Sequence, residues 1–225
     1  MRGSGLVVVA APVDRIADLV AQVAPFLEPD TLVTDVGSVK AEIVRRATAA
    51  VVGRGRFVGS HPMAGSEKTG WEHASPTLFD RRTCFVTQND ASDPSAVETL
   101  IRFWSDLGSD VATVDPDVHD EIVAHISHLP QVLASSLCSY LATKNPSWAN
   151  LAGNGLRDTT RIAASDPRIW RSILEQNRDE ILRAIREFQD ELHAFQTSLS
   201  NKDYIDVVAR LERGKAYRDR FRPSR

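Results

Sequence analysis

Short runs of apolar, mostly β-branched residues recur along the first half of the chain and end near residue 115. They occupy residues 6–10, 32–35, 57–59, 84–87 and 111–114. Segments of helical length separate several of these runs, and such alternation predicts βαβ crossovers and a mainly parallel sheet. The first run is apolar at every position, which is typical of a strand buried on both faces. The chain therefore begins as an α/β domain.

Proline, glycine and capping residues mark where the helices between these strands begin and end. Asp14 is the expected N-cap of a helix that Pro25 ends. Gly37 forms an expected tight turn, and Ser38 is the expected N-cap of a helix that reaches residue 50. A further helix is expected over residues 96–107.

From residue 115 onward the apolar residues recur at helical spacing only. One expected helix face consists of Val118, Ile122, Val123, Ile126 and Leu129. Pro130 lacks a backbone donor and should kink or break this helix just after His128. The second half is therefore expected to be all-helical.

The C-terminal part should contain a long amphipathic helix. A loop is expected at residues 153–155, and Ser165-Asp166-Pro167 is a strong helix start after it. Apolar residues then step by three and four between residues 181 and 199, and a stripe of that length needs a surface to pack against. A partner subunit is the expected surface, which predicts a homodimer. The tail at residues 213–225 is expected to be solvated and frayed.

The composition excludes several classes of protein. The 225 residues predict two domains, at residues 1–115 and 116–225. The net charge of −3 gives no general attraction for nucleic acid. The longest apolar run, residues 6–12, is far below the ~20 residues that a membrane span needs, and no signal peptide is recognised. Two cysteines, Cys84 and Cys138, predict a reducing cytoplasm.

Polar and glycine-containing segments follow three of the expected strands, at residues 11–13, 35–40 and 60–67. Parallel strands place their carboxyl ends at one edge of the sheet, where ligands bind in this fold class. Gly37 permits close backbone approach there, and Ser38 stands where helix amides favour an anionic or polar group. His61 is the natural group for proton transfer near neutral pH.

Each of these features also has a purely structural interpretation. The turn at residues 37–38 fits a simple cap, and His61 fits a hydrogen-bonded structural histidine. His125 and His128 stand three apart on a helix, but no cluster of cysteines or carboxylates completes a metal site, so no metal is expected.

Two arginines, Arg157 and Arg161, bracket a pair of threonines. They fit either a solvated turn or a carboxylate site, because a guanidinium group binds a carboxylate with two hydrogen bonds.

Ordered sequence strings carry a more specific signal. They are DVGSVK at residues 35–40, GSHPMAGSE at 59–67, SHLP at 127–130, RDTTRIA at 157–163, SDP at 165–167 and Trp170. In this order they resemble the prephenate/arogenate dehydrogenase family of tyrosine biosynthesis. The resemblance implies a Rossmann-type NAD or NADP domain followed by an all-helical dimerisation domain. It also implies oxidative decarboxylation of prephenate or arogenate.

The resemblance implies roles for individual residues. His61 matches the family's histidine that accepts the proton of the substrate hydroxyl, and Ser38 matches the serine that contacts this hydroxyl and the nicotinamide side. His128 matches a histidine of the active-site cleft. Arg161 matches the arginine that binds a substrate carboxylate, and Arg157 is a basic position nearby.

Further positions concern the pocket wall and the cofactor. Ser66 and Glu67 match a loop that screens the substrate pocket. The cofactor is expected beside Ala11, Pro12, Val13 and Gly37. Gln131 stands where many members that use prephenate have a second histidine, so the choice between prephenate and arogenate stays open.

The beginning of the chain departs from the family pattern. No G-x-G-x-x-G string occurs, and the loop at residues 11–13 corresponds to the one after the family's fourth strand. This implies a partial nucleotide-binding domain, short by roughly 70 residues at ~30 per βαβ unit. It also implies an impaired cofactor site, and a first strand exposed at the sheet edge.

Two alternatives remain. One is a catalytically inactive dimeric module that binds an aromatic carboxylate. The other, a reductase of hydroxy acids or imines with similar architecture, leaves the RDTTR string unexplained.

Overall fold

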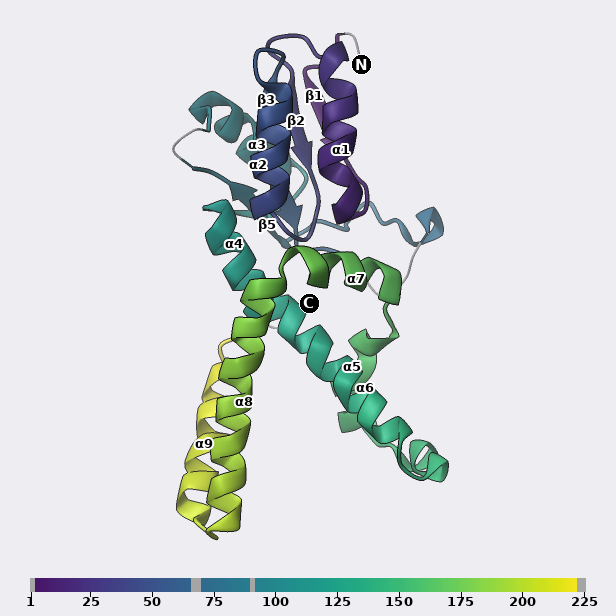
Figure 1. Ribbon diagram of the computed structural model, residues 1–225, viewed down its shortest axis with the longest axis vertical. Coiled ribbons are helices and arrows are strands. Elements are labelled where there is room, and N and C mark those ends of the chain that lie inside the picture. The colour runs from purple at the N-terminus through teal and green to yellow at the C-terminus, as the bar shows by residue number, and fades with distance from the viewer. Residues whose placement is uncertain (1–2, 66–69, 90–91, 222–225) are drawn as a thin grey trace. The chain divides into compact units, whose positions relative to one another are not determined.

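The computed structural model describes residues 3–65, 70–89 and 92–221 (Figure 1). The chain divides into two compact units, Met1–Ile181 and Leu182–Arg225. The first unit contains all the strands of the described residues.

Two three-stranded sheets lie in the first unit, in the orders β1-β2-β3 and β4-β5-β6. The strands are β1 (Leu6–Val9), β2 (Leu32–Asp35), β3 (Arg56–Phe57), β4 (Ser60–Pro62), β5 (Thr83–Thr87) and β6 (Asp110–Val114). Every pairing is parallel except that of β4 with β5. The predicted mainly parallel α/β sheet is confirmed.

Strand β1 forms an edge of its sheet, because it pairs only with β2 among the described strands. Val8 is 40% exposed there, so the prediction of a strand buried on both faces is wrong for β1. Strand β2, which has a neighbour on each side, is buried at all four positions.

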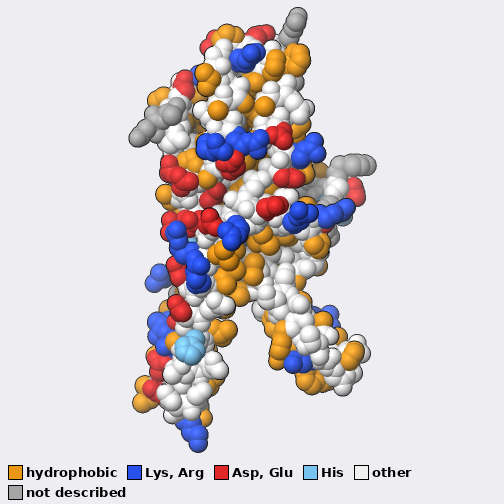
Figure 2. All heavy atoms as spheres, in the orientation of Figure 1, with side chains coloured by type: hydrophobic (Ala, Val, Ile, Leu, Met, Phe, Trp, Pro, Cys, Tyr) orange, Lys and Arg blue, Asp and Glu red, His pale blue; other side chains and the backbone are white. Residues whose placement is uncertain are grey.

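Helices α1 (Val13–Val23) and α2 (Ala41–Val51) pack against this sheet (Figure 1). Their buried faces meet the strands through a core that includes Ile16, Val20, Val33, Ile43 and Ala47. On their solvent faces, acidic and basic side chains mix (Figure 2), and Arg46 pairs with Asp18 at 2.5 Å. The expected cap at Asp14 is wrong, because this residue lies in the first turn and makes no capping hydrogen bond.

A second core lies under the other sheet. Helix α3 (Pro94–Asp106) begins at its cap Asp93, whose carboxylate accepts hydrogen bonds from the amides of Ser95 and Ala96. Its buried residues Leu100 and Trp104 pack with Cys84 of β5.

The helical region begins with α4 (Pro116–Val123), a π-helical turn (Ala124–His128) and α5 (Leu129–Ala142). The wide π turn lies just before Pro130, where the sequence predicted a kink. The predicted apolar face is only partly correct: Val123 and Leu129 are buried, but Val118 and Ile126 are about half exposed. The buried side of this region instead carries polar residues.

Two shorter helices and a long one follow. The loop predicted at residues 153–155 is shorter than expected, because α6 (Asn154–Thr160) begins at its second residue. Helix α7 (Pro167–Gln176) begins as predicted, with Asp166 accepting a hydrogen bond from the amide of Arg168. The long helix predicted over residues 181–199 is confirmed as α8 (Arg178–Ser200).

The second unit contains most of α8 and all of α9 (Tyr204–Arg218), which run side by side (Figure 1). Arg210 joins them, because its guanidinium group contacts Glu191 at 3.0 Å and Asp206 at 2.6 Å. The prediction of a frayed tail from residue 213 is wrong as far as Arg218, where α9 ends. None of the described helices combines the length and apolar character needed to span a membrane.

Candidate active site

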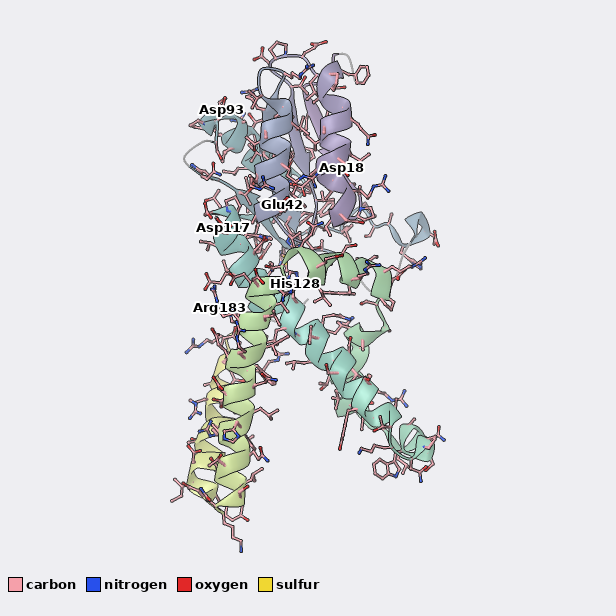
Figure 3. All side chains as sticks on the ribbon, viewed as in Figure 1. Asp18, Glu42, Asp93, Asp117, His128 and Arg183 are labelled. Carbon is pink, nitrogen blue, oxygen red and sulfur yellow. The ribbon has the colours of Figure 1, made fainter. Side chains whose placement is uncertain are left out.

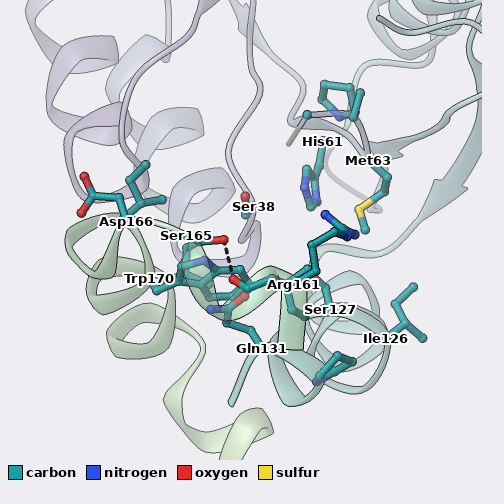
Figure 4. Close-up of a pocket in the computed structure, with 17 residues that line it drawn as sticks. Ser38, His61, Met63, Ile126, Ser127, Gln131, Arg161, Ser165, Asp166 and Trp170 are labelled. Atoms are coloured by element: carbon teal, nitrogen blue, oxygen red, sulfur yellow. Dashed lines mark hydrogen bonds between the residues drawn. The ribbon is translucent and has the colours of Figure 1, made fainter. Parts of the chain in front are cut away.

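A cavity of about 460 Å³ lies beyond the end of β2 (Figure 4). Its wall includes Ser38, which follows β2, and His61 of β4. Gln131 and Arg161 of the helical region line the same cavity. The structure therefore brings together four of the residues that the sequence predicted as a site.

His61 is the outer member of a hydrogen-bonded row. Its Nδ1 lies 2.9 Å from Nε2 of His119, and Nδ1 of His119 lies 2.8 Å from Oδ1 of Asp120. His61 is 7% exposed. Burial, with smaller contributions from His119 and Lys40, lowers the pKa of His61 well below 6.5. His61 is therefore a neutral imidazole at physiological pH, able to accept a proton.

Asp120 also holds the start of α2. Its Oδ1 accepts a hydrogen bond of 2.7 Å from the amide of Lys40, and its Oδ2 accepts one of 2.9 Å from the amide of Ala41. The prediction that Ser38 caps this helix is wrong: Lys40 occupies the N-cap position, and the capping carboxylate comes from α4. Ser38 is left to line the cavity.

A buried ion pair stabilises the turn between β2 and α2. The ammonium group of Lys40 contacts the carboxylate of Asp35, and both side chains are fully buried. The Lys40 ammonium also donates a hydrogen bond of 2.9 Å to the carbonyl of Ser60. Burial lowers the pKa of Lys40, against the attraction of Asp35. The pair thus joins the end of β2 to the residue before His61.

His128 has no exposed surface, and it lies directly before α5 (Figure 3). Its Nδ1 lies 3.1 Å from Nδ2 of Asn177, and its ring packs edge-on against Trp170 with 5.9 Å between centroids. Burial lowers the pKa of His128 to about 4, although the Asp120 carboxylate acts in the opposite direction. His128 contacts the wall residue Trp170 but does not itself line the cavity.

The expected cofactor positions follow two neighbouring parallel strands. Ala11, Pro12 and Val13 come after β1, and Gly37 comes after β2. A Cβ atom at Gly37 would lie 2.7 Å from Cδ1 of Ile16, so no larger residue fits this turn without movement.

The remaining predicted residues are Arg157, Ser66 and Glu67. Arg157 lines a different cavity of about 570 Å³, together with Lys144 and Trp148. Ser66 and Glu67 fall outside the described residues.

Three residues of the site were missed by sequence reasoning: His119, Asp120 and Asn177. The adjacent His-Asp pair on a predicted helix was an available signal, but the apolar spacing pointed to a different face. Asn177 ends α7 and gave no signal. Within the described ranges, no group of three His, Cys, Asp or Glu side chains could hold a metal ion.

Comparisons with known proteins agree with this architecture. Residues 1–113 match the family model of the prephenate dehydrogenase nucleotide-binding domain, and residues 115–213 match that of its dimerisation domain. The prephenate dehydrogenase of Bacillus subtilis is 33% identical over 97% of this chain and 60% of its own length.

Two solved structures are similar throughout. A prephenate dehydrogenase from A. aeolicus, in complex with hydroxyphenyl propionate and NAD+, has a TM-score of 0.89 and 30% identity. The match covers 95% of this chain and 75% of that one. Synechocystis arogenate dehydrogenase has a TM-score of 0.85 and 27% identity, over 97% and 79% of the two chains.

The chain spans about 60% of the length of the curated relatives from Bacillus subtilis and Lactococcus lactis. Together the two family models account for nearly all of its residues, and they meet where the strands give way to helices. The chain belongs to the prephenate dehydrogenase family.

Proposed function

We propose that this chain carries the catalytic centre of an NAD- or NADP-dependent dehydrogenase that oxidatively decarboxylates prephenate or arogenate. The observation that carries this proposal is the row His61–His119–Asp120, which ends at a cavity shared with Arg161. Such a substrate has a ring hydroxyl that must lose a proton and carboxylates that need a cation. This cavity offers a neutral imidazole for the first and a guanidinium group for the second.

The proposed chemistry divides between His61 and the groups around it. The carbon bearing the ring hydroxyl loses a hydride while the hydroxyl gives its proton to the enzyme. The ring carboxylate then leaves as carbon dioxide, its bonding electrons make the ring aromatic, and the resulting phenolate oxygen takes the proton back. A bound nicotinamide supplies the hydride acceptor. His61 accepts the proton, and the Asp120 carboxylate stabilises the resulting imidazolium through His119. The Ser38 hydroxyl contacts the substrate hydroxyl, and Arg161 binds a carboxylate.

The described residues fit the nicotinamide end of the cofactor. The segments after β1 and β2 lie at adjacent carboxyl ends of parallel strands, where dinucleotides bind in this fold class. Ser38, on the second segment, lines the same cavity as His61. Loop residues Ser66 and Glu67 are proposed to screen this cavity. Arg157, which lines a different cavity, is proposed to attract the anionic substrate by its charge, and His128 is proposed to support the cavity wall.

Substrate choice is proposed to depend on Gln131. This side chain is 5% exposed, and its Oε1 has no hydrogen-bond partner among the described residues. Arogenate carries an ammonium group where prephenate has a keto oxygen, and an ammonium group donates to such an acceptor. Comparing kcat/KM for the two substrates in the natural chain and in Gln131→His tests this dependence.

A homodimer is proposed through the helical region. Apolar residues stay exposed on the α8–α9 pair, including Leu192, Leu199, Ile205 and Leu211, and Ile205 is 87% exposed. A monomeric protein rarely leaves so many large apolar side chains in solvent along one pair of helices. The cytoplasmic location predicted from the two cysteines is also kept as a proposal.

The function is tested by calorimetric titration of the 225-residue chain with NAD+ and NADP+, followed by assay of carbon dioxide release and nicotinamide reduction with each substrate. The Bacillus subtilis enzyme is the positive control, and His61→Asn is the variant expected to bind substrate without turnover. Turnover by the natural chain supports the proposal. Binding of an aromatic carboxylate without turnover, unchanged in His61→Asn, would instead support the inactive binding module.

A further inference from the structure

We propose that Asp120 holds two of the three buried histidines of this site in opposite tautomers, His61 as a proton acceptor at Nε2 and His128 as a proton donor at Nε2. Asp120 acts on His61 through His119, and on His128 through Asn177. Asp120, His119 and Asn177 are therefore positioning residues. The consequences for catalysis rest on the proposed function, but the tautomers themselves do not.

The first branch starts at the Asp120 carboxylate, which accepts hydrogen bonds and cannot donate them. Its two oxygens already accept from the amides of Lys40 and Ala41. The proton in the 2.8 Å contact with His119 must therefore belong to Nδ1 of His119. A neutral imidazole with a proton on Nδ1 has a lone pair on Nε2.

That lone pair fixes the proton of the next ring. Nε2 of His119 lies 2.9 Å from Nδ1 of His61, so His61 donates through Nδ1. Its Nε2, which this contact does not use, then carries the lone pair. Burial lowers the pKa of both histidines, which keeps the row neutral and fixes the direction of its hydrogen bonds.

The second branch starts at the main-chain carbonyl of Asp120, which is also an acceptor. Nδ2 of Asn177 lies 2.8 Å from this oxygen, so the amide NH2 group must face it. The carbonyl thereby determines the orientation of the Asn177 amide, an orientation otherwise inferred from surrounding hydrogen bonds. The same NH2 group lies 3.1 Å from Nδ1 of His128.

His128 must therefore accept at Nδ1 and carry its proton on Nε2. Its Nε2 is buried and has no hydrogen-bond partner among the described residues. The two branches thus end at different parts of the cavity wall, one at His61 and the other at Trp170, which the His128 ring contacts. Asp120 of α4 thus sets a proton acceptor at Nε2 of His61 and a proton donor at Nε2 of His128.

The geometry also admits a defined competing arrangement. If His119 were an imidazolium, its Nε2 would donate to Nδ1 of His61, and the proton of His61 would sit on Nε2 instead. His61 could then accept no proton from a substrate at that atom. The two arrangements differ in which nitrogen of His61 is protonated, and this difference is measurable without substrate or cofactor.

The test is nitrogen NMR of the 225-residue chain labelled with 15N in its six histidines. Protonated and unprotonated imidazole nitrogens differ widely in chemical shift, and single His→Gln variants assign the signals. We expect protonated Nδ1 in His61 and His119, and protonated Nε2 in His128. A proton on Nε2 of His61, or on Nδ1 of His128, overturns the proposal.

Matched variants test each branch. Asn177→Asp replaces the donor with an acceptor, so we expect the proton of His128 to move to Nδ1, or a second proton to bind, while His61 is unchanged. Asn145→Asp makes the same change at an exposed helix cap and should leave all six histidines unchanged. An unchanged His128 signal in Asn177→Asp shows that Asn177 does not set this tautomer.

In the first branch, His119→Gln keeps an acceptor for His61, whereas His119→Leu removes it. We expect a mixture of His61 tautomers in His119→Leu alone. If the chain turns over substrate, kcat should fall roughly 10–100-fold in His119→Leu with little change in KM, and His119→Gln should recover most of it. If it does not turn over substrate, the NMR result still decides the tautomers, so the two proposals fail separately. A single His61 tautomer in His119→Leu contradicts the branch.

Discussion

Replacing Lys40 with Met tests how strongly the buried ion pair stabilises the turn beneath the cavity. Met keeps most of the aliphatic length but removes the ammonium group, and with it the contact to Asp35 and the 2.9 Å hydrogen bond to the Ser60 carbonyl. A charged hydrogen bond contributes about 1.5–3 kcal/mol, and breaking a buried pair by removing one partner costs about 3–5 kcal/mol. We expect the free energy of unfolding to fall by about 3–5 kcal/mol.

Urea unfolding at pH 7, followed by circular dichroism, measures this loss. Arg45→Met is the control, because it removes an exposed pair with Glu42 and should cost less than about 1 kcal/mol. Adding Asp35→Asn to Lys40→Met should recover much of the loss, since the amide oxygen can still accept from the Gly37 amide and no charge stays buried alone. Equal losses in Lys40→Met and Arg45→Met would refute the reasoning.

Three further predictions concern pH, assembly and the tight turn. The pKa of His128 is about 4 in the folded protein against 6.5 when unfolded, so the unfolded chain binds the extra proton first and stability is lost as pH falls through this range. This group should remove about 2 kcal/mol between pH 7 and pH 5; urea unfolding of His128→Gln should show a shallower pH dependence, and an unchanged one contradicts the assignment. Phe188→Asp with Leu192→Asp places unpaired charges in the proposed interface, at a cost of several kcal/mol. Light scattering should then report half the dimer mass, while the exposed Gln189→Asp on the same helix stays dimeric; a dimer in both shows that the stripe packs elsewhere. Gly37→Ala forces a methyl group against Ile16, at a cost of about 1–3 kcal/mol in urea unfolding; Gly155→Ala, which meets nothing within 4 Å, should cost less than half as much.

The sequence predicted the elements whose signals are local. Continuous β-branched runs identified β1, β2, β5 and β6, whereas the run at residues 57–59 did not separate β3 from β4. Asp166 followed by Pro167 identified the start of α7, because its cap lies within two residues of the amide it binds. The prediction of β1 as a fully buried strand was wrong because composition reports how apolar a strand is, not how many neighbours it has. That number depends on the sheet, and among the described strands β1 has one neighbour, β2.

The start of α2 shows where local reasoning ends. Ser38 has a suitable side chain for a cap, but the amides of Lys40 and Ala41 are bound by a carboxylate that lies 80 and 79 positions later, respectively. A cap supplied from another element has no local sequence pattern. The hydrogen-bonded row behind His61 also could not be predicted locally. His119 and Asp120 are adjacent in sequence, but they contact β4 and α2 only in the folded chain.

Two predictions were wrong for one reason, the apolar face of this region and the Ser38 cap. The reason is the polar character of the buried face of α4 and of the π-helical turn after it. Apolar spacing pointed to the side that carries Val118 and Ile126, yet these are about half exposed, while His119 and His128 have no exposed surface. A polar group can be buried at low cost only when its hydrogen bonds are made. Both ring nitrogens of His119 have a partner, whereas His128 has one at Nδ1 and none at its buried Nε2 among the described residues. The carboxylate that caps α2 is therefore also what allows His119 to occupy the core side of α4. Removing it by Asp120→Ala would leave two amides and an imidazole without an acceptor, so stability and the proton position at His61 should change together.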